Sequence, residues 1–178
     1  MIRRLIIVLA LAALAAHGQT LKLDGLEKLA DKASETVNVT LNESLLRLAA
    51  RFLSDSDADQ VQIKKLVTGL KGIYVRSYEF ENTGEYSRAD VDAIRNQLRD
   101  PKWNRIVQVH SKADGEDADV FLRQEADDRI SGLVVLSAEP KEFTVVDIEG
   151  PIDMDGLVKL AGNFGIPEDL KKFGKKAK

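Results

Sequence analysis

Four strand-like runs follow one another in the second half of the chain with only short turns between them, and this succession restricts the fold more than any other feature. The turns contain Asp114-Gly115, Asp127-Asp128 and Glu139-Pro140-Lys141, which are residue types that favour chain reversal. Strands joined by such short turns pair antiparallel, because a parallel neighbour needs a long crossover. The four runs are residues 105–111, 118–125, 130–138 and 142–149.

The apolar pattern within these runs predicts their places in the sheet. Leu133-Val134-Val135-Leu136 is apolar on both sides, which is typical of a central strand with both faces buried. In the run 105–111, Val107 and Val109 alternate with polar residues, so we expect this strand to be more exposed.

The first half of the chain mixes helical and strand-like patterns. Ser87 and Asp90 resemble a capping box at the start of a helix that must stop near Pro101. Two earlier helices are separated by an acidic turn at residues 54–59. Apolar spacing predicts helices at 24–33, 45–53, 63–70 and 87–98, and strands at 37–41 and 73–81.

Helices segregated from a late antiparallel run of strands favour an α+β fold over an α/β fold. We expect a mainly antiparallel sheet of five to six strands with helices packed chiefly on one face. Residues 19–165 form a single domain in this interpretation, with a last helix near 154–161. Residues 166–178 form a lysine-rich C-terminal tail.

The beginning of the chain has the pattern of a secretory signal peptide. Basic Arg3 and Arg4 precede the uncharged apolar stretch 5–16, and small residues follow. A membrane-spanning helix needs about 20 apolar residues, more than this stretch supplies, so we expect cleavage and no stable membrane anchor.

Two cleavage sites fit the preference of signal peptidase for small residues. Ala16 and Gly18 suit a cut before Gln19, which makes residues 1–18 the signal peptide, and Ala13-Leu14-Ala15 offers a competing site. Either cut predicts an exported bacterial protein that is periplasmic or extracellular.

Composition excludes several classes of function. The sequence contains no cysteine, which removes thiol catalysis, thiolate metal sites and disulfides. Loss of Arg3 and Arg4 makes the net charge of −3 more negative, and this balance argues against a nucleic-acid-binding surface.

The segment 142–153, preceded by Gly132-Leu133-Val134-Val135-Leu136, resembles the C-terminal half of a bacterial family catalogued as domain of unknown function 4252. Residues 70–75 and 103–107 are similar to the same family, so the resemblance spans most of the mature chain. The resemblance implies an exported bacterial envelope protein. It implies no activity and supplies no catalytic residues.

His110 is the one histidine that remains after removal of the signal peptide. A zinc site built on paired imidazoles therefore lacks a second ligand. A general base would also need a nucleophile and an orienting acid, and the chain has no Gly-x-Ser-x-Gly elbow. We interpret His110 as a partly exposed structural residue on the less apolar face of its strand.

Two acidic clusters could hold a cation but have simpler structural explanations. Asp55-Ser56-Asp57-Ala58-Asp59 begins like a calcium-binding loop, yet Gln60 and Leu66 stand where a glycine and a bidentate acid belong. A helix cap at Ser56 or Asp57 explains this cluster better. The second cluster brackets Gly115 in a predicted solvated hairpin turn and consists of Asp114, Glu116, Asp117 and Asp119.

Other candidate groups also have both a functional and a structural interpretation. Paired glycines at 69–72 and 162–165 are typical of helix ends, without the lysine and serine of a phosphate loop. The aromatic residues could form a binding surface, but core or rim packing is more usual. They are Trp103, Tyr74, Tyr78 and Tyr86.

The remaining charged candidates are strand-end acids and tail lysines. Glu125, Asp147 and Glu149 lie near predicted strand ends, where pairing with Arg or Lys is the ordinary explanation. The tail lysines could touch anionic lipid or an acidic partner, and a solvated tail is the alternative. They are Lys171, Lys172, Lys175, Lys176 and Lys178.

These patterns favour a non-catalytic binding or interaction module of the cell envelope. We expect no catalytic, metal-binding or cofactor-binding residues and no cofactor, and the partner is an envelope protein or ligand that the sequence does not identify. An envelope-stress or regulatory partner protein is a narrower alternative. A carboxylate-dependent hydrolase is the more distant one, because paired acids are the catalysts that remain.

We predict that the protein is exported and cleaved, because a basic start precedes a short apolar stretch and small residues. Intact-mass analysis of the exported protein should give a chain that starts at or near Gln19. A full-length chain that begins with Met1 and stays in the cytosol would contradict this prediction.

Overall fold

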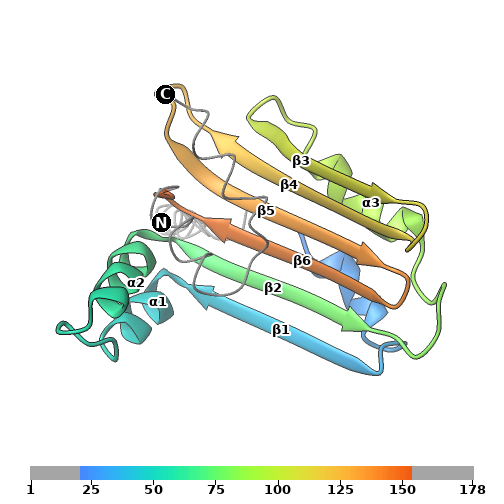
Figure 1. Ribbon diagram of the computed structural model, residues 1–178, viewed down its shortest axis with the longest axis horizontal. Helices are drawn as coiled ribbons and strands as arrows, with labels where there is room; N and C mark the ends of the chain where they lie inside the picture. The colour runs from blue at the N-terminus through green and yellow to red at the C-terminus, as the bar shows by residue number, and fades with distance from the viewer. Residues whose placement is uncertain (1–20, 154–178) are drawn as a thin grey trace, which may run out of the picture.

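A six-stranded antiparallel sheet forms the centre of the computed structural model, which describes residues 21–153 (Figure 1). The strand order across the sheet is β1-β2-β6-β5-β4-β3. The predicted signal peptide, the last helix, the glycine pair at 162–165 and the tail lysines lie outside the described residues. The strands are β1 (Glu35–Asn42), β2 (Gly72–Glu79), β3 (Trp103–Ser111), β4 (Glu116–Gln124), β5 (Ile130–Glu139) and β6 (Glu142–Glu149).

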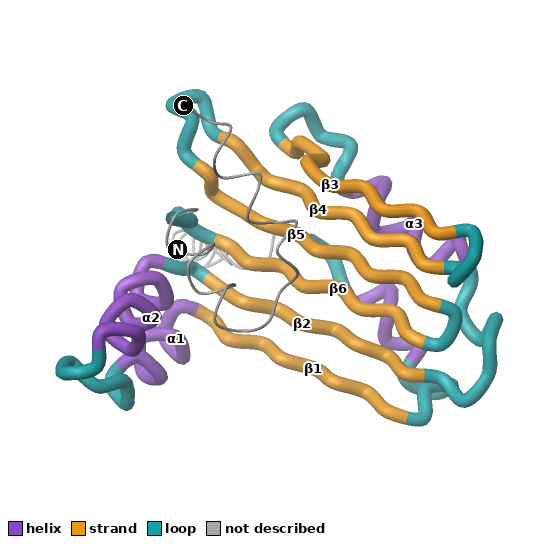
Figure 2. Tube along the Cα trace, viewed as in Figure 1, coloured by secondary structure: helices purple, strands orange, loops and turns teal. Residues whose placement is uncertain are grey.

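Four helical segments accompany the sheet. The short 3-10 helix η1 (Asp24–Leu29) and α3 (Arg88–Gln97) lie against one face, here called the first face (Figure 1). Helices α1 (Glu43–Ala50) and α2 (Ala58–Gly69) form a hairpin at the end of the sheet where β1 ends and β2 begins (Figure 2). The predicted α+β class and the antiparallel sheet of six strands are confirmed. Of the helices within residues 21–153, only η1 and α3 cover the first face, whereas α1 and α2 pack at the end of the sheet.

Local capping explains where the longer helices begin. The Asn42 side chain accepts a hydrogen bond from the backbone of Leu45, and Asp57 caps α2 in the same way. Ser87 and Asp90 form the predicted capping box. The short η1 lacks such a cap: its N-cap position is Leu23, and Asp24 lies inside the first turn.

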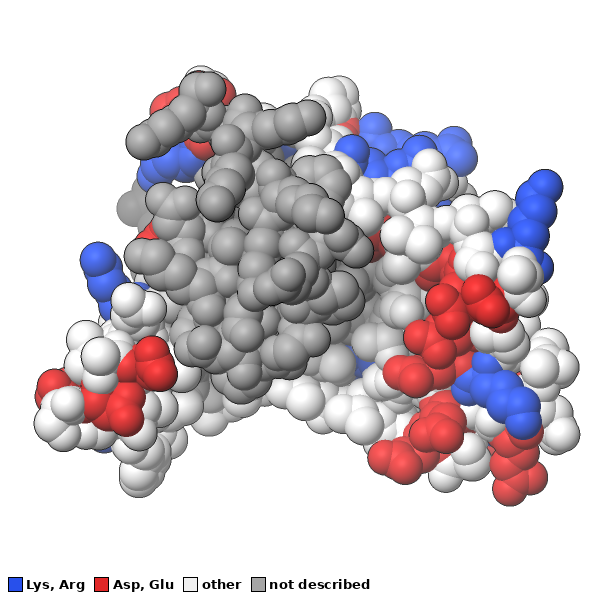
Figure 3. All heavy atoms as spheres, in the orientation of Figure 1, with Lys and Arg blue, Asp and Glu red and all other residues white. Residues whose placement is uncertain are grey.

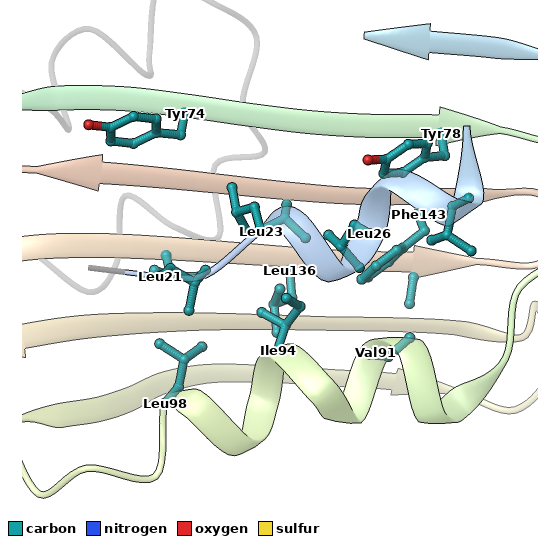
Figure 4. Packing of buried hydrophobic residues seen from close by; sticks show 14 of the residues in the cluster. Leu21, Leu23, Leu26, Tyr74, Tyr78, Val91, Ile94, Leu98, Leu136 and Phe143 are labelled. Carbon is teal, nitrogen blue, oxygen red and sulfur yellow. The ribbon is translucent and has the colours of Figure 1, made fainter. Parts of the chain in front are cut away.

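The first face carries the main core. Tyr78, Phe80 and Phe143 are fully buried there. Leu26 of η1 and Val91 of α3 belong to the same cluster (Figure 4). The Tyr86 ring stacks between Phe80 and Phe143, with ring centroids 5.4 Å from each. Tyr74 and Tyr78 are buried, and Tyr86 and Trp103 pack at the margin. The aromatic residues are therefore core and rim packing, as the structural interpretation predicted.

The second face of the sheet has side chains sorted into rows by the strand register. Each strand has one valine that is the register partner of a valine on the neighbouring strand. These valines form a continuous row across the whole sheet. A second row of leucine and isoleucine runs beside it. The valine row is Val39, Val75, Val146, Val135, Val120 and Val107, and the leucine–isoleucine row is Leu41, Ile73, Ile148, Leu133 and Leu122.

Polar rows lie on the other side of the valine row. Ser77, Thr144 and Ser137 are register neighbours, and the hydroxyls of Ser77 and Thr144 are 2.6 Å apart. Beyond them the strand ends bring glutamates side by side. This glutamate row consists of Glu35, Glu79, Glu142 and Glu139.

The chain leaves β6 through a turn that requires glycine. Gly150 has φ +118°, and a Cβ there would lie 2.7 Å from the backbone nitrogen of Lys71. The backbone of Ile152 then donates a hydrogen bond to Ile130. Ile152 is buried with Leu133 at the leucine–isoleucine end of the second face.

The placement of β5 and β3 agrees with their apolar patterns. β5 lies between β4 and β6, whereas β3 is an edge strand. The expectation that both faces of β5 are buried holds only in part, because Val134 is fully buried on the first face and Val135 is half-buried on the second.

Replacing Val134 by Asp should unfold the domain or nearly so. An unpaired charge in the core costs several kcal/mol, against a total stability of about 5–15 kcal/mol. Val109→Asp is the matched control, because Val109 lies on edge strand β3 and is 48% exposed. Urea unfolding should show a collapse of stability for the first variant and a small change for the second. Similar midpoints for the two variants would contradict this picture of the core.

Candidate functional site

A cluster of opposite charges lies where α3 packs against β4 and β3. Asp119 is fully buried and accepts a hydrogen bond from Arg95 Nε at 2.7 Å. Arg105 Nη1 lies 3.4 Å from the other carboxylate oxygen. Two guanidinium groups therefore lie against one buried carboxylate and supply the opposite charge that a buried acid needs.

The sequence predicted that the acids around Gly115 form a solvated turn, and this was wrong for Asp117 and Asp119. Gly115 does form a turn with φ +71°. However, alternation along β4 places Asp117 and Asp119 on the same face as Phe121, which belongs to the core. Composition near a turn could not reveal this, because the side of the sheet that α3 covers is set by tertiary packing.

His110 contacts the Asp117 carboxylate through Nδ1. This hydrogen bond holds the pKa of Asp117 below its usual range, and Arg95 and Arg88 support it from 3.8 and 3.9 Å. The His110 side chain is half exposed, as predicted. Asp117 could orient the imidazole as a base, but no hydroxyl of residues 21–153 hydrogen-bonds the ring. The contact is a hydrogen bond that joins β3 and β4 at the sheet edge.

A pocket of about 340 Å³ opens beside this pair and is lined by Tyr86, Arg88, Arg95, Asp117 and Glu139 among others. Burial and the nearby acids Asp117 and Glu139 raise the pKa of Tyr86 to about 12. Its phenol therefore stays protonated and donates to the Glu139 carbonyl. The polar groups of this pocket are thus largely engaged with one another.

Asp147 is the most unusual ionisable residue of the described chain. It lies on the first face of β6 between Tyr74 and Val134 and is fully buried. Neither carboxylate oxygen has a hydrogen-bond partner of normal geometry. Burial and the charge of Glu149 raise its pKa to about 7, although Arg123 and the Leu21 backbone act in the opposite direction. Asp147 is therefore largely neutral below pH 7.

Sequence reasoning assigned Asp147 to cross-strand pairing, and the structure contradicts that. The alternation of Phe143, Val145, Asp147 and Glu149 along β6 carries the signal, because every second residue faces the core. The same assignment is confirmed for Glu149, whose carboxylate lies 3.1 Å from Arg123.

Arg123 organises the other acids at this end of the sheet. Its guanidinium hydrogen-bonds Ser131 at 2.9 Å and lies over the Trp103 ring at 5.4 Å. Glu125 accepts a hydrogen bond from the Ser131 hydroxyl at 2.7 Å, which lowers its pKa. A pocket of about 710 Å³ beside this network is lined by Arg123, Glu125 and Ser131, while Asp147 does not belong to its lining. The buried acid is therefore separated from this opening.

The α1–α2 hairpin carries an exposed apolar patch, here called the hairpin patch. Phe52 is 84% exposed just after α1, whereas Phe80, Phe121 and Phe143 are buried. The apolar residues of α1 occupy more of the helix circumference than one face can bury, so part of them stays exposed. The patch consists of Leu45, Leu48, Phe52 and Val61.

The remaining candidates have the structural roles that were predicted. Asp57 caps α2 through the backbone of Asp59 and Gln60, and Asp55 pairs with Lys64 at 2.6 Å. Gly69 is the last residue of α2. Between residues 21 and 153, no three His, Asp or Glu side chains form a group that could hold a metal ion. None of the helices in that part of the chain has the length and apolarity needed to cross a membrane.

Comparison with known proteins gives one match. The sequence profile of a family described as Domain of unknown function (DUF4252) matches residues 30–160. No curated protein and no solved structure matches the chain significantly.

Asp147 should make the protein less stable as the pH rises. Its folded pKa of about 7 lies above the unfolded value of 3.8. The free-energy cost of ionising Asp147 in the folded protein is therefore absent below pH 4 and fully present above pH 7. Asp147→Asn should therefore stabilise the protein at pH 8 by up to about 4 kcal/mol, with little effect near pH 3. Urea unfolding across this range measures the difference.

Asp90→Asn is a control, because it should change the stability in the opposite direction to Asp147→Asn. Burial opposes ionisation of Asp90, but hydrogen bonds from Lys28 and Ser87 hold its pKa at about 2. This variant should lose stability at neutral pH and lose little at pH 2. A stability difference between wild type and Asp147→Asn that does not change between pH 3 and 8 would contradict the assignment to Asp147.

Proposed function

Since the chain belongs to the family described as Domain of unknown function (DUF4252), we propose that it is an exported protein of the bacterial cell envelope that acts by binding another protein through the hairpin patch. The pattern of a signal peptide in residues 1–18 supports export. The resemblance noted in the sequence points to the same location.

Phe52 carries the proposal for binding. Exposing a large aromatic side chain is costly unless another surface covers it, and aromatic residues are enriched at the centres of protein interfaces. Leu45 and Leu48 extend the apolar surface along α1, and Val61 extends it onto α2. Leu46 anchors the hairpin to the domain, because it packs in the buried cluster with Leu70 and Leu133.

The charge around the patch favours a protein partner over an anionic surface. Acidic and basic residues of the hairpin are equal in number, so that neither a lipid headgroup layer nor a nucleic acid gains from its net charge. Two pairs are already formed within the hairpin, Arg47 with Glu43 and Lys64 with Asp55. A partner that offers an apolar groove fits these properties. The charged residues are Glu43, Asp55, Asp57, Asp59, Arg47, Arg51, Lys64 and Lys65.

Photo-cross-linking in intact cells tests this function. A photoreactive amino acid at position 48 or 52 should give an adduct with the same envelope protein, and the same residue at position 112 should not, because Lys112 lies in the β3–β4 turn. Excess wild-type protein should compete for the adduct in an envelope extract. Protein carrying Leu48→Ser and Phe52→Ser should fail to compete.

Folding controls separate lost binding from lost structure. Phe52→Ser should change stability by less than about 1 kcal/mol, because the side chain is exposed. Leu46→Ser should cost several times as much, because Leu46 is buried. Adducts formed only with lipid or with a second copy of the chain, or equal adducts at positions 52 and 112, would overturn the proposal.

A further inference from the structure

The side chains on the second face of the sheet change along the strands from apolar to polar to acidic. Its leucine–isoleucine row lies next to the hairpin, where Leu46 and Leu70 pack against it. The valine row, the hydroxyl row of Ser77, Thr144 and Ser137, and the glutamate row follow in that order. Among the described helices, η1 and α3 lie on the opposite face (Figure 1). A surface with this order suits a segment that is apolar at one end and basic at the other.

The glutamate row is costly without a counter-charge. Glu79 stands opposite both Glu35 and Glu142, and like charges in such positions destabilise a sheet. Burial, Glu142 and Glu116 together raise the pKa of Glu139. Figure 3 shows acidic side chains gathered toward the right-hand end of this face, where these strands end or begin. The cluster therefore favours a cationic occupant.

The part of the chain beyond Asp153 has the matching order of residue types. Apolar residues recur at helical spacing immediately after Asp153, and five lysines follow the last acid, Asp169. Ile152 already lies against the leucine–isoleucine end of the second face. The apolar residues are Met154, Leu157, Val158 and Ala161, and the lysines are Lys171, Lys172, Lys175, Lys176 and Lys178.

We propose that residues 154–178 lie along the second face, with their apolar part over the leucine–isoleucine and valine rows and their lysines against the glutamate row. The C-terminal segment is then a constitutive part of the domain. This inference is independent of the hairpin patch and replaces the interpretation of residues 166–178 as a solvated tail.

Residues 154–178 are long enough to reach from the leucine–isoleucine row to the glutamate row. Ile148 and Glu142 mark the two ends of the graded face on β6, and strand geometry separates them by about 20 Å. A helix over residues 154–164 would span about 16 Å. The residues that follow can cover the rest of the distance several times over at about 3.3 Å each. The family match also extends to residue 160, so the family pattern includes the first part of this segment.

Nitroxide labels can locate the segment, because the chain has no cysteine of its own. The mature protein, labelled with ¹⁵N, should carry Ala161→Cys or Lys175→Cys with a nitroxide attached. The label at 161 should remove most of the amide intensity of Val75, Val135 and Val146. The label at 175 should do the same to Glu79 and Glu142, while α2 keeps its intensity under both labels.

A charge variant tests the second half of the proposal. The double variant Glu79→Gln and Glu142→Gln should abolish the effect of the label at 175 and leave that of the label at 161 unchanged. It relieves like-charge repulsion, so the fold should persist. Unchanged broadening from position 175 would overturn the lysine–glutamate contact.

Two further outcomes identify other occupants. Mixing nitroxide-labelled ¹⁴N chain with unlabelled ¹⁵N chain should give no broadening, and broadening there would assign the face to a second copy of the protein. Failure of the label at 161 to affect the valine row would overturn the proposal outright and leave the face to an external partner.

Discussion

The pairing of β6 with β2 holds the two halves of the molecule together. β1 and β2 come from the first half of the chain, whereas β3 to β6 form a meander in the second half, and the β2–β6 ladder joins them over eight register pairs from Gly72↔Glu149 to Glu79↔Glu142. On the first face this ladder places Phe143 opposite Tyr78, which are among the largest fully buried side chains. On the second face it makes the valine row continuous. Both layers of side chains therefore depend on one register.

Features determined by local interactions could be predicted from the sequence. The meander follows from three short turns, and the starts of α2 and α3 follow from Asp57, Ser87 and Asp90. The insertion of β6 between β2 and β5 could not be predicted, because strand pairing across about 70 residues leaves no local signal. The face covered by α3 was also unpredictable, and that face decides the environment of Asp119 and Asp147.

The two buried aspartates, Asp119 and Asp147, differ because different residues surround their carboxyl groups. Asp119 is met by Arg95 and Arg105, so its charge is compensated within the core. Asp147 stands between Tyr74 and Val134 without a hydrogen-bond partner of normal geometry in the described structure, and burial raises its pKa to about 7. The same residue type on the same face thus contributes an ion pair in one place and a carboxyl group with a raised pKa in the other. The first face is a structural layer covered by η1 and α3, so the proposed contacts of the hairpin patch and of the C-terminal segment both lie elsewhere on the domain.

The order of the strands in the sheet also determines when the fold can be completed. β6 is the last strand of the described chain, yet it lies inside the sheet between β2 and β5. A chain emerging from its N-terminal end can form the β1–β2 pair and most of the meander, but the two remain separate sheets with open edges until residues 142–149 arrive. Cooperative folding is therefore a late event in synthesis, and the growing chain keeps unpaired strand edges until β6 has been made.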